Sequence, residues 1–422
     1  MNNVSETIHK GFISKPFVEH QLVPNITWDD SFKDNPLLGW EQPEGKGWGI
    51  YTNFHIGADW LTKDKPIIVV PKMENIDFLE LFMHCFSEDD SGSFSEIYHI
   101  DTSGKLITAP NLNSILSQLV IIRYLKVLSL IIKKGLLKQY VVREQNLRKV
   151  KGRIVVNAND RLNVRRRNLE KVYCGFSEYS IDNPINGLLK RALTFCHTLL
   201  TSLNKKTEHS KSYANVMAVI GRQLSAFSGV GDYIGNNYQF KANKLYSEYK
   251  EAVSLALQIL KRYDNSISQV SKEQSQVPPF WIDMSLLYEH YAYSLMKEAY
   301  GKRILYQEEG YQSVRPDFLY LDKDEQYILD TKYMPQFKDK HISYDIERQL
   351  SGYARDFKIL RKLGVPVDKI NSVNVPCVII YPTVSHKEDN PFKGHAIKEL
   401  LVGETYYSNF YTIALPLPTI LP

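Results

Sequence analysis

The stretch that most constrains this 422-residue chain is residues 314–333, VRPDFLYLDKDEQYILDTKY. Two apolar segments are separated by a polar run, which is the pattern of a β-hairpin. Asp330 and Lys332 stand inside the second predicted strand, where side chains two residues apart point to the same face. A hairpin partner can bring Asp317 beside them. We therefore expect two carboxylates and an ammonium to converge on one face of a strand.

Such a group of side chains could form a metal site or a simple surface ion pair. Two carboxylates held close together repel each other unless a cation lies between them, and their hard oxygens suit Mg²⁺. A lysine beside the metal can orient or deprotonate a water molecule and stabilise charge on a phosphate. The alternative is an exposed strand with an ordinary surface ion pair, which an Asp-x-Lys triplet alone favours. The ordered set favours a metal site, because a predicted helix bearing Gln349 and Tyr353 follows the hairpin.

This ordered set resembles the PD-(D/E)xK nuclease superfamily. The pattern stands here as PD at residues 316–317 followed by DTK at residues 330–332. Gln349 and Tyr353, four residues apart, are similar to the motif that follows this core in RecB-like nucleases. A closer resemblance is to the McrC family, the nuclease subunits of McrBC-type restriction systems. It extends to family-like segments outside the core, at residues 151–154, 182–186 and 284–288.

The resemblance implies roles for individual side chains. Asp317 and Asp330 are expected to coordinate Mg²⁺, for which Mn²⁺ could substitute, and Glu289 stands where related nucleases often place an acid that supports the metal. Lys332 is expected to position the attacking water. Gln349 and Tyr353 would orient the lysine or the phosphate. The catalytic set is therefore Asp317, Asp330, Lys332, Gln349 and Tyr353, and the metal set is Asp317, Asp330 and Glu289.

The net charge of +5 is distributed unevenly along the chain. Residues 133–171 contain thirteen Lys or Arg against three acids, a local charge of +10. Here basic residues alternate with Val, Ile and Leu, so a strand can bury one side and present cations on the other. Such cations bind phosphates without reading sequence; the alternative is a solvated charged face. The residues expected to contact double-stranded DNA are Lys151, Arg153, Arg165, Arg166 and Arg167.

Composition also bears on the compartment. Four scattered cysteines without a C-x-x-C pair suit a reducing cytoplasm and argue against a disulfide framework or a zinc site. The first residues lack a basic region followed by an apolar core, so we expect no secretory signal. The most apolar window, residues 115–132, is interrupted by Gln118, Arg123 and Lys126, and is expected to be a buried helix. We therefore expect a cytoplasmic protein without a membrane partner.

The chain is long enough for two or three domains of the α/β class. We expect a β-rich N-terminal domain at residues 1–110, a helical basic middle region at 111–270 and a C-terminal PD-(D/E)xK nuclease core, a mixed sheet flanked by helices, at 271–422. Helices are predicted at residues 112–134, 187–203 (capped by Asp182 or Asn183), 242–262, 284–300 and 344–363. Strands are predicted at residues 49–54, 66–72, 376–382 and 406–415, and a polar loop at 264–279.

The resemblance implies a Mg²⁺-dependent DNA endonuclease subunit. The McrC family works with rings of McrB-type AAA+ GTPases; its N-terminal part engages the ring and stimulates GTP hydrolysis, and its C-terminal part cuts. This chain has no G-x-x-x-x-G-K-[ST] phosphate loop, so we expect no nucleotide site in it and a motor on another polypeptide. Two alternatives remain: a stand-alone RecB-like repair or resolvase nuclease, and a non-catalytic adaptor that activates the GTPase.

Overall fold

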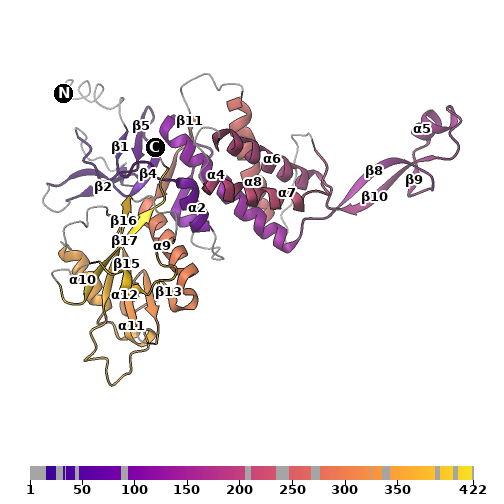
Figure 1. The fold of residues 1–422 in the computed structure, drawn as a ribbon. Helices are drawn as coiled ribbons and strands as arrows, with labels where there is room; N and C mark the ends of the chain where they lie inside the picture. Colours follow the sequence, from indigo (N-terminus) through magenta and orange to yellow (C-terminus); the bar gives the residue numbers. More distant parts are fainter. Residues whose placement is uncertain are drawn as a thin grey trace, which may run out of the picture. The chain divides into compact units, whose positions relative to one another are not determined.

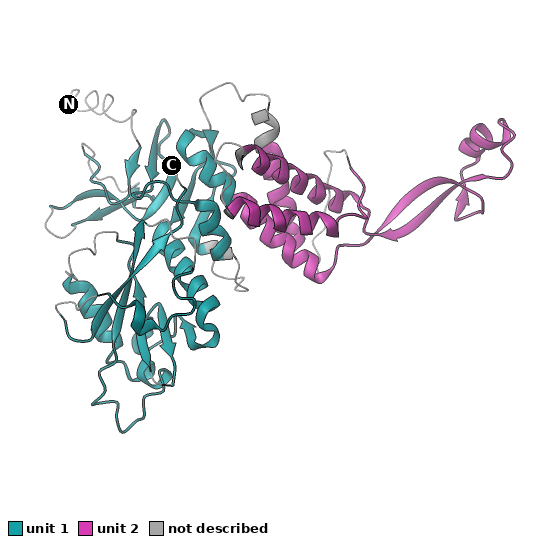
Figure 2. Cartoon of the chain, in the orientation of Figure 1, with its two compact units in different colours: residues 1–119, 272–422 teal, residues 120–271 magenta. Residues whose placement is uncertain are grey.

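The computed structural model divides into two compact units, residues 1–119 together with 272–422, and residues 120–271 (Figure 2). The residues that the structure describes are 16–24, 32–33, 35–42, 47–86, 94–204, 211–233, 247–267, 276–323, 325–334, 343–384, 390–402 and 407–420. The domains predicted at residues 1–110 and 271–422 thus fall, apart from residue 271, in one unit.

A five-stranded mixed sheet forms the C-terminal part of the first unit (Figure 1). Its strands, in spatial order, are β13 (Ile304–Tyr306), β14 (Phe318–Leu321), β15 (Gln326–Thr331), β16 (Cys377–Val384) and β17 (Phe410–Leu417). The first three are antiparallel, and β15, β16 and β17 run parallel. The predicted hairpin is present as β14 and β15, and β15 lies in the middle of the sheet. A strand paired on both sides is a rigid platform for side chains at its end.

Helices cover both faces of this sheet. Alternation along the strands places Leu319, Ile328 and Ile379 on one face, where they pack with α10 (Tyr344–Tyr353) and α11 (Phe357–Lys362) in one apolar core. Phe318 and Tyr320 point to the other face and contact aromatic rings of α9 (Met284–Tyr300). The predicted helix over residues 284–300 is confirmed in full.

The single helix predicted over residues 344–363 is wrong, because the chain forms two helices there. Asp356 lies between α10 and α11, and its Oδ1 accepts hydrogen bonds from Lys358 N and Ile359 N at 2.8 and 3.1 Å. This is the geometry of an N-cap, so a new helix begins after Asp356.

The N-terminal part of the first unit contains a second five-stranded sheet. In spatial order its strands are β1 (Phe17–Val18), β5 (Lys65–Val70), β4 (His55–Thr62), β12 (Phe280–Asp283) and β6 (Tyr98–Ile100). Smaller elements around it are β2 (Leu38–Glu41) with β3 (Gly49–Thr52), β7 (Ile107–Thr108) with β11 (Gln276–Val277), α2 (Phe78–Phe86) and α3 (Phe94–Ile97).

Strand β12 explains why the two ends of the chain form one unit. It immediately precedes α9 in sequence, yet it pairs with β4 and β6 of the N-terminal sheet. The approach to β4 is close at Gly57, where an added Cβ would lie 2.0 Å from the Phe280 carbonyl oxygen, and where φ is +149°. Glycine at residue 57 therefore permits the pairing.

The second unit is helical, with a β-ribbon. Its helices are α4 (Pro110–Lys134, which begins in the first unit), α6 (Pro184–Asn204), α7 (Lys211–Ala226) and α8 (Ser247–Ile267). Of the predicted elements, residues 242–246 and 268–275 lie outside the described residues. Helix α8 extends to Ile267 and so covers the first four residues of the predicted loop. Helix α4 has the length and hydropathy of a membrane span, but 72% of its most apolar window is buried, as in a core helix.

The turn before α6 is held by buried amides. Asn183 Oδ1 accepts a hydrogen bond from Asn186 N at 3.0 Å, so Asn183 and not Asp182 is the N-cap. Both asparagine side chains donate to the Leu137 carbonyl oxygen at 2.9 Å. Asp182 instead pairs with Arg143 at 2.7 Å.

Residues 139–180, which include most of the basic segment 133–171, form the β-ribbon and the segment that it carries (Figure 1). Strands β8 (Gln139–Leu147) and β10 (Val172–Ser180) pair along their whole lengths, and β9 (Arg153–Ile154) adds to β10. Between β9 and β10 the chain forms α5 (Val156–Asn159) and a π-helical turn, η3 (Asp160–Val164).

Candidate active site

The hairpin register brings the two predicted aspartates together. The pairing of β14 with β15 ends at Phe318 opposite Leu329, and one further step places Asp317 opposite Asp330. Asp330 is still inside β15, where it pairs with Ile379 of β16 and is 1% exposed. Both carboxylates thus stand where the antiparallel hairpin meets the parallel part of the sheet.

Asp317 is held by the residue that follows Asp330. Its Oδ2 accepts hydrogen bonds from Thr331 N at 2.6 Å and Thr331 Oγ1 at 2.5 Å. On the other side, the Asp317 carbonyl oxygen accepts from Gln307 N at 2.9 Å, which continues the pairing between β13 and β14. Thr331 occupies the variable position of the Asp-x-Lys triplet and was not predicted as a site residue. Its hydroxyl, next to Asp330 and near the expected position of Asp317, was the sequence feature that could have indicated this role.

Lys332 connects Asp330 to helix α10. Its Nζ lies 2.5 Å from Asp330 Oδ2 and donates a hydrogen bond to Gln349 Oε1 at 3.1 Å. Gln349 Nε2 in turn donates to the Tyr353 hydroxyl at 2.8 Å. Gln349 and Tyr353 share one face of α10 because they are four residues apart. The five residues predicted as catalytic therefore form one hydrogen-bonded and electrostatic cluster.

Glu289 approaches this cluster from α9. Its Oε1 accepts a hydrogen bond from Gln307 Nε2 at 2.8 Å. Tyr306 also hydrogen-bonds it, and repulsion from Asp330 is among the causes that raise the pKa of Glu289. Glu289 is therefore within electrostatic range of the aspartates but is already engaged by two side chains of the β13 segment.

Burial raises the pKa of all three acids, and repulsion between carboxylates raises those of Asp317 and Glu289 further. The pKa of Asp317 is raised well above its usual value, first by burial and then by the negative charges of Asp330 and Glu289. Burial also raises the pKa of Asp330, against the opposing effect of the Lys332 ammonium. Burial raises the pKa of Tyr353 to about 12, so its hydroxyl stays protonated and can donate near neutral pH. An added cation would relieve the repulsion between the carboxylates.

The donor set fits a weakly held divalent cation. Asp330 Oδ2 is a buried oxygen that accepts no hydrogen bond of acceptable geometry from any described residue, although the Lys332 ammonium is nearby. Carboxylate oxygens of this kind suit Mg²⁺, which often uses only one or two of them and keeps several waters. Within the described residues, no three His, Cys, Asp or Glu side chains are grouped to hold a metal. Glu289 is thus not placed as a third direct ligand.

The five basic residues predicted to contact DNA lie together beyond β8, and all are exposed. Two of them have acidic partners. Lys151 Nζ lies 3.3 Å from Glu178 and 3.9 Å from the centre of the Phe176 ring, and Arg165 Nε lies 2.7 Å from Asp160. Large apolar side chains are exposed among them, namely Val150, Ile154, Val156, Val164 and Leu169. This surface is therefore mixed in character, with both cations and exposed aliphatic groups.

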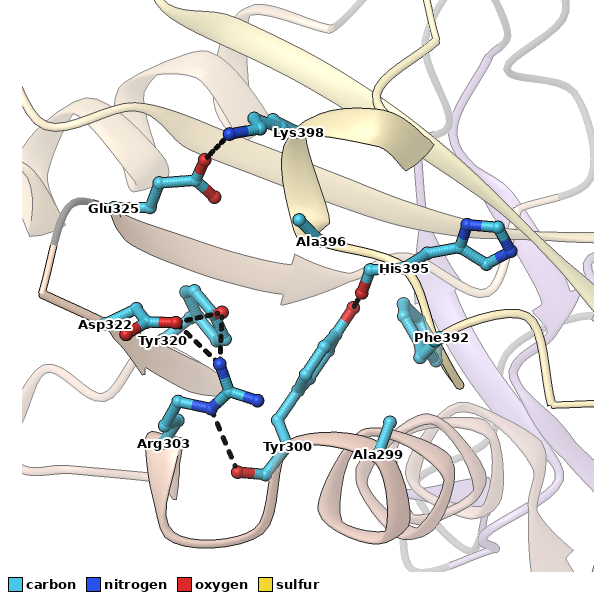
Figure 3. Close-up of a pocket in the computed structure, with 11 residues that line it drawn as sticks. Ala299, Tyr300, Arg303, Tyr320, Asp322, Glu325, Phe392, His395, Ala396 and Lys398 are labelled. Carbon is cyan, nitrogen blue, oxygen red and sulfur yellow. Dashed lines mark hydrogen bonds and ion pairs between the residues drawn. The ribbon is translucent and has the colours of Figure 1, made fainter.

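A cavity of about 430 Å³ lies elsewhere in the C-terminal sheet (Figure 3). It adjoins the turn of the hairpin, at the opposite end of β14 and β15 from Asp317 and Asp330. Its charged groups are paired: Arg303 Nη1 lies 2.6 Å from Asp322, and Lys398 Nζ lies 2.9 Å from Glu325 (Figure 3). The cavity is therefore separate from the cluster around Asp317, Asp330 and Lys332, which we call the carboxylate cluster.

Comparisons with known proteins identify a family. The sequence model of a family described as "McrBC 5-methylcytosine restriction system component" matches residues 61–358. Two solved structures from Thermococcus gammatolerans are similar. One is a half-complex of McrB AAA+ hexamers with bound McrC, at 15% identity over 96% of this chain and 95% of that chain, with a TM-score of 0.39. The other is the McrBC complex, at 14% identity over 67% of this chain and 86% of that chain, with a TM-score of 0.29. No curated protein matches the sequence.

Proposed function

Because the chain belongs to the McrBC family of restriction-system components, which confirms the resemblance found in its sequence, we propose that it is the nuclease subunit of such a system. It hydrolyses phosphodiesters of double-stranded DNA in the cytoplasm. The observation that carries this proposal is the cluster of Asp317, Asp330 and Lys332 at the end of a central strand, where Lys332 Nζ lies 2.5 Å from Asp330.

Each residue of the cluster has its own role in the proposed hydrolysis. Asp317 and Asp330 would hold Mg²⁺, which supplies charge neutralisation at the phosphate and a more acidic water. Lys332 holds the attacking water in line with the scissile phosphate, because its flexible ammonium can donate to both. Gln349 accepts from Lys332 and fixes its position, and the protonated Tyr353 hydroxyl supports Gln349. Phosphoryl chemistry depends mainly on such positioning and electrostatic stabilisation.

The proposed partner is a McrB-type AAA+ GTPase ring, whose GTP hydrolysis this chain stimulates. Family membership supports this pairing, and the chain itself has no phosphate-loop sequence. The exposed cations around Arg166 and Arg167 are proposed to bind DNA phosphates. Phosphate contacts of this kind hold the duplex while sequence or modification is recognised elsewhere.

A plasmid-cleavage assay with the McrB-type GTPase of the same system, GTP and Mg²⁺ tests the proposal. Plasmids with and without 5-methylcytosine are compared for the wild type, Asp330→Ala, and the control Asp345→Ala, which changes an exposed aspartate of α10. We expect cleavage by the wild type and the control only when all components are present, and none by Asp330→Ala. Equal cleavage without the GTPase would favour a repair nuclease. GTP turnover that rises without any cleavage would favour an adaptor.

A further inference from the structure

A lysine of the N-terminal sheet reaches the residue that follows Lys332. Lys72 lies two residues after β5, and its Nζ donates a hydrogen bond to the Tyr333 carbonyl oxygen at 2.6 Å. The same ammonium lies 3.9 Å from the centre of the Tyr333 ring and 5.2 Å from that of Phe54. These distances are those of cation–π contacts. One side chain thus binds both the backbone and the ring of Tyr333, 261 residues away in sequence.

Glu19, the residue that follows β1, completes this contact. The Glu19 side chain is 4% exposed, and its Oε2 accepts hydrogen bonds from Lys72 N at 2.9 Å and the Tyr333 hydroxyl at 3.4 Å. Tyr333 itself is 2% exposed and packs on Tyr288 of α9. We call Glu19, Lys72 and Tyr333 the latch. Its three members come from the N-terminal sheet and from the end of the catalytic strand.

The latch is one of two anchors on the backbone that carries Lys332. Lys332 N donates to the Ile380 carbonyl oxygen at 2.9 Å, so the peptide before the side chain is bound to β16. The chain after it is held one residue further on, because Lys72 binds the Tyr333 carbonyl oxygen and Glu19 binds the Tyr333 hydroxyl. Because the chain is anchored at Lys332 N and again at Tyr333, the Lys332 side chain reaches Asp330 and Gln349 from a restricted backbone position.

Stability alone does not account for a lysine at position 72. Burial lowers the pKa of Lys72 to about 8, against the opposing effect of Glu19. A side chain without charge would be easier to bury there. What an apolar side chain could not supply is a charged donor to the Tyr333 carbonyl oxygen, and charge-assisted hydrogen bonds are the stronger ones.

We propose that Lys72 is a positioning residue for cleavage, which holds Lys332 in place through the Tyr333 backbone and so links the N-terminal sheet to the catalytic strand. This inference rests on the proposed nuclease function. It predicts that a residue outside the C-terminal sheet controls the rate of the chemical step. A displacement of about 1 Å at a catalytic group can lower the rate on the order of 10²-fold.

The test compares Lys72→Met with the matched control Lys105→Met in the cleavage assay. Lys105 also belongs to the N-terminal part, lies 4.5 Å from the Trp60 ring and donates to a backbone carbonyl oxygen, but it has no contact with the catalytic strand among the described residues. We expect Lys72→Met to lower the cleavage rate constant about 10²-fold at an unchanged KM and unchanged GTP turnover. Lys72→Arg, which keeps the charged donor, should recover most of the rate, and Lys105→Met should cleave as the wild type does. Cleavage by Lys72→Met at the wild-type rate, or an equal loss in both methionine variants, would overturn the inference.

A second measurement separates this inference from the nuclease proposal. In protein labelled with ¹³C,¹⁵N-lysine, the Lys332 side-chain signal is identified by its loss in Lys332→Arg. We expect this signal to move in Lys72→Met and to stay in place in Lys105→Met, whether or not any DNA is cut. An unmoved signal in Lys72→Met would overturn the positioning role. Absence of cleavage by the wild type, with a signal that moves, would overturn the nuclease proposal alone.

Discussion

Replacing Lys332 by methionine should destabilise the fold at neutral pH as well as abolish cleavage. The substitution keeps most of the apolar stem and removes the ammonium that lies 2.5 Å from Asp330 Oδ2. Asp330 is then a carboxylate with 1% exposure and, among the described residues, no ion-pair partner. The effect on stability therefore measures how strongly the fold depends on this ion pair.

The size of the effect follows from the burial of the two partners. Breaking a fully buried pair by removing one partner costs about 3–5 kcal/mol. Lys332 is 20% exposed, so water reaches its side of the pair, and we expect the lower end of this range, about 3 kcal/mol at pH 7. For a unit of about 270 residues, this lowers Tm by about 5 °C. An exposed pair such as Lys393 with Glu298 contributes less than about 1 kcal/mol, so Lys393→Met is the matched control.

The stability loss in Lys332→Met should grow as pH rises. Burial raises the pKa of Asp330 in the folded protein, and without Lys332 it rises further. The folded variant then binds a proton that the unfolded chain, with a carboxyl pKa of about 3.9, has already lost. The unfolded chain behaves alike in both proteins, so stability relative to the wild type falls as pH rises through the raised pKa of Asp330 in the folded wild type, and the deficit disappears below that pKa.

Differential scanning fluorimetry at pH 4 and pH 7, without added metal, checks both the size and the sign. The double variant Asp330→Asn, Lys332→Met should recover most of the lost Tm at pH 7, because no charge is left unpaired. A deficit of the same size at both pH values would refute the reasoning. So would a loss at pH 7 no larger than that of Lys393→Met.

Two further predictions concern the latch and the basic surface. Burial raises the pKa of Glu19 to about 7. Between the ordinary carboxyl pKa and pH 7 the folded state therefore binds more protons than the unfolded state. The free energy of unfolding accordingly falls as pH rises across that window, by on the order of 3 kcal/mol. Glu19→Gln should remove this fall from a Tm-against-pH profile, and an unchanged profile would contradict the assignment. Replacing Arg166 and Arg167 by glutamine should reduce the slope of log affinity for DNA against log salt concentration by about 1.8, that is, about 0.9 for each lost phosphate contact. An unchanged slope in fluorescence anisotropy would show that these arginines do not contact phosphate.

Local sequence patterns predicted the elements that carry the carboxylate cluster. Helix α9 begins and ends where expected because both ends are coded locally: Asp283 Oδ1 accepts from Leu286 N at 3.0 Å, and Gly301 follows the last turn with a φ of +59°. The hairpin was predictable for a similar reason, since its alternation and polar turn lie within twenty residues. Once the hairpin is assumed, its register alone places Asp317 opposite Asp330.

Contacts that depend on distant segments were not predictable in this way. The break after α10 depends on Asp356, whose Oδ2 also accepts from Tyr311 N, 45 residues earlier. The link between Lys72 and Tyr333 joins residues that no local pattern relates, and it requires two sheets to be packed together. A lysine after a strand is ordinarily a surface residue, so the sequence around Lys72 does not indicate that its side chain will be half-buried against the Tyr333 ring.

The pairing of β12 with β4 and β6 also changes where a C-terminal domain can be divided from the rest of the first unit. Division at residue 271 would place β12 with the C-terminal part, and would deprive β4 and β6 of the strand that lies between them. It would also separate Asp77 N from its acceptor, the Pro418 carbonyl oxygen, at 2.8 Å. Backbone groups released in this way are costly if they remain buried without partners. Strand β15 and the residues that follow it are therefore supported by contacts from both ends of the chain.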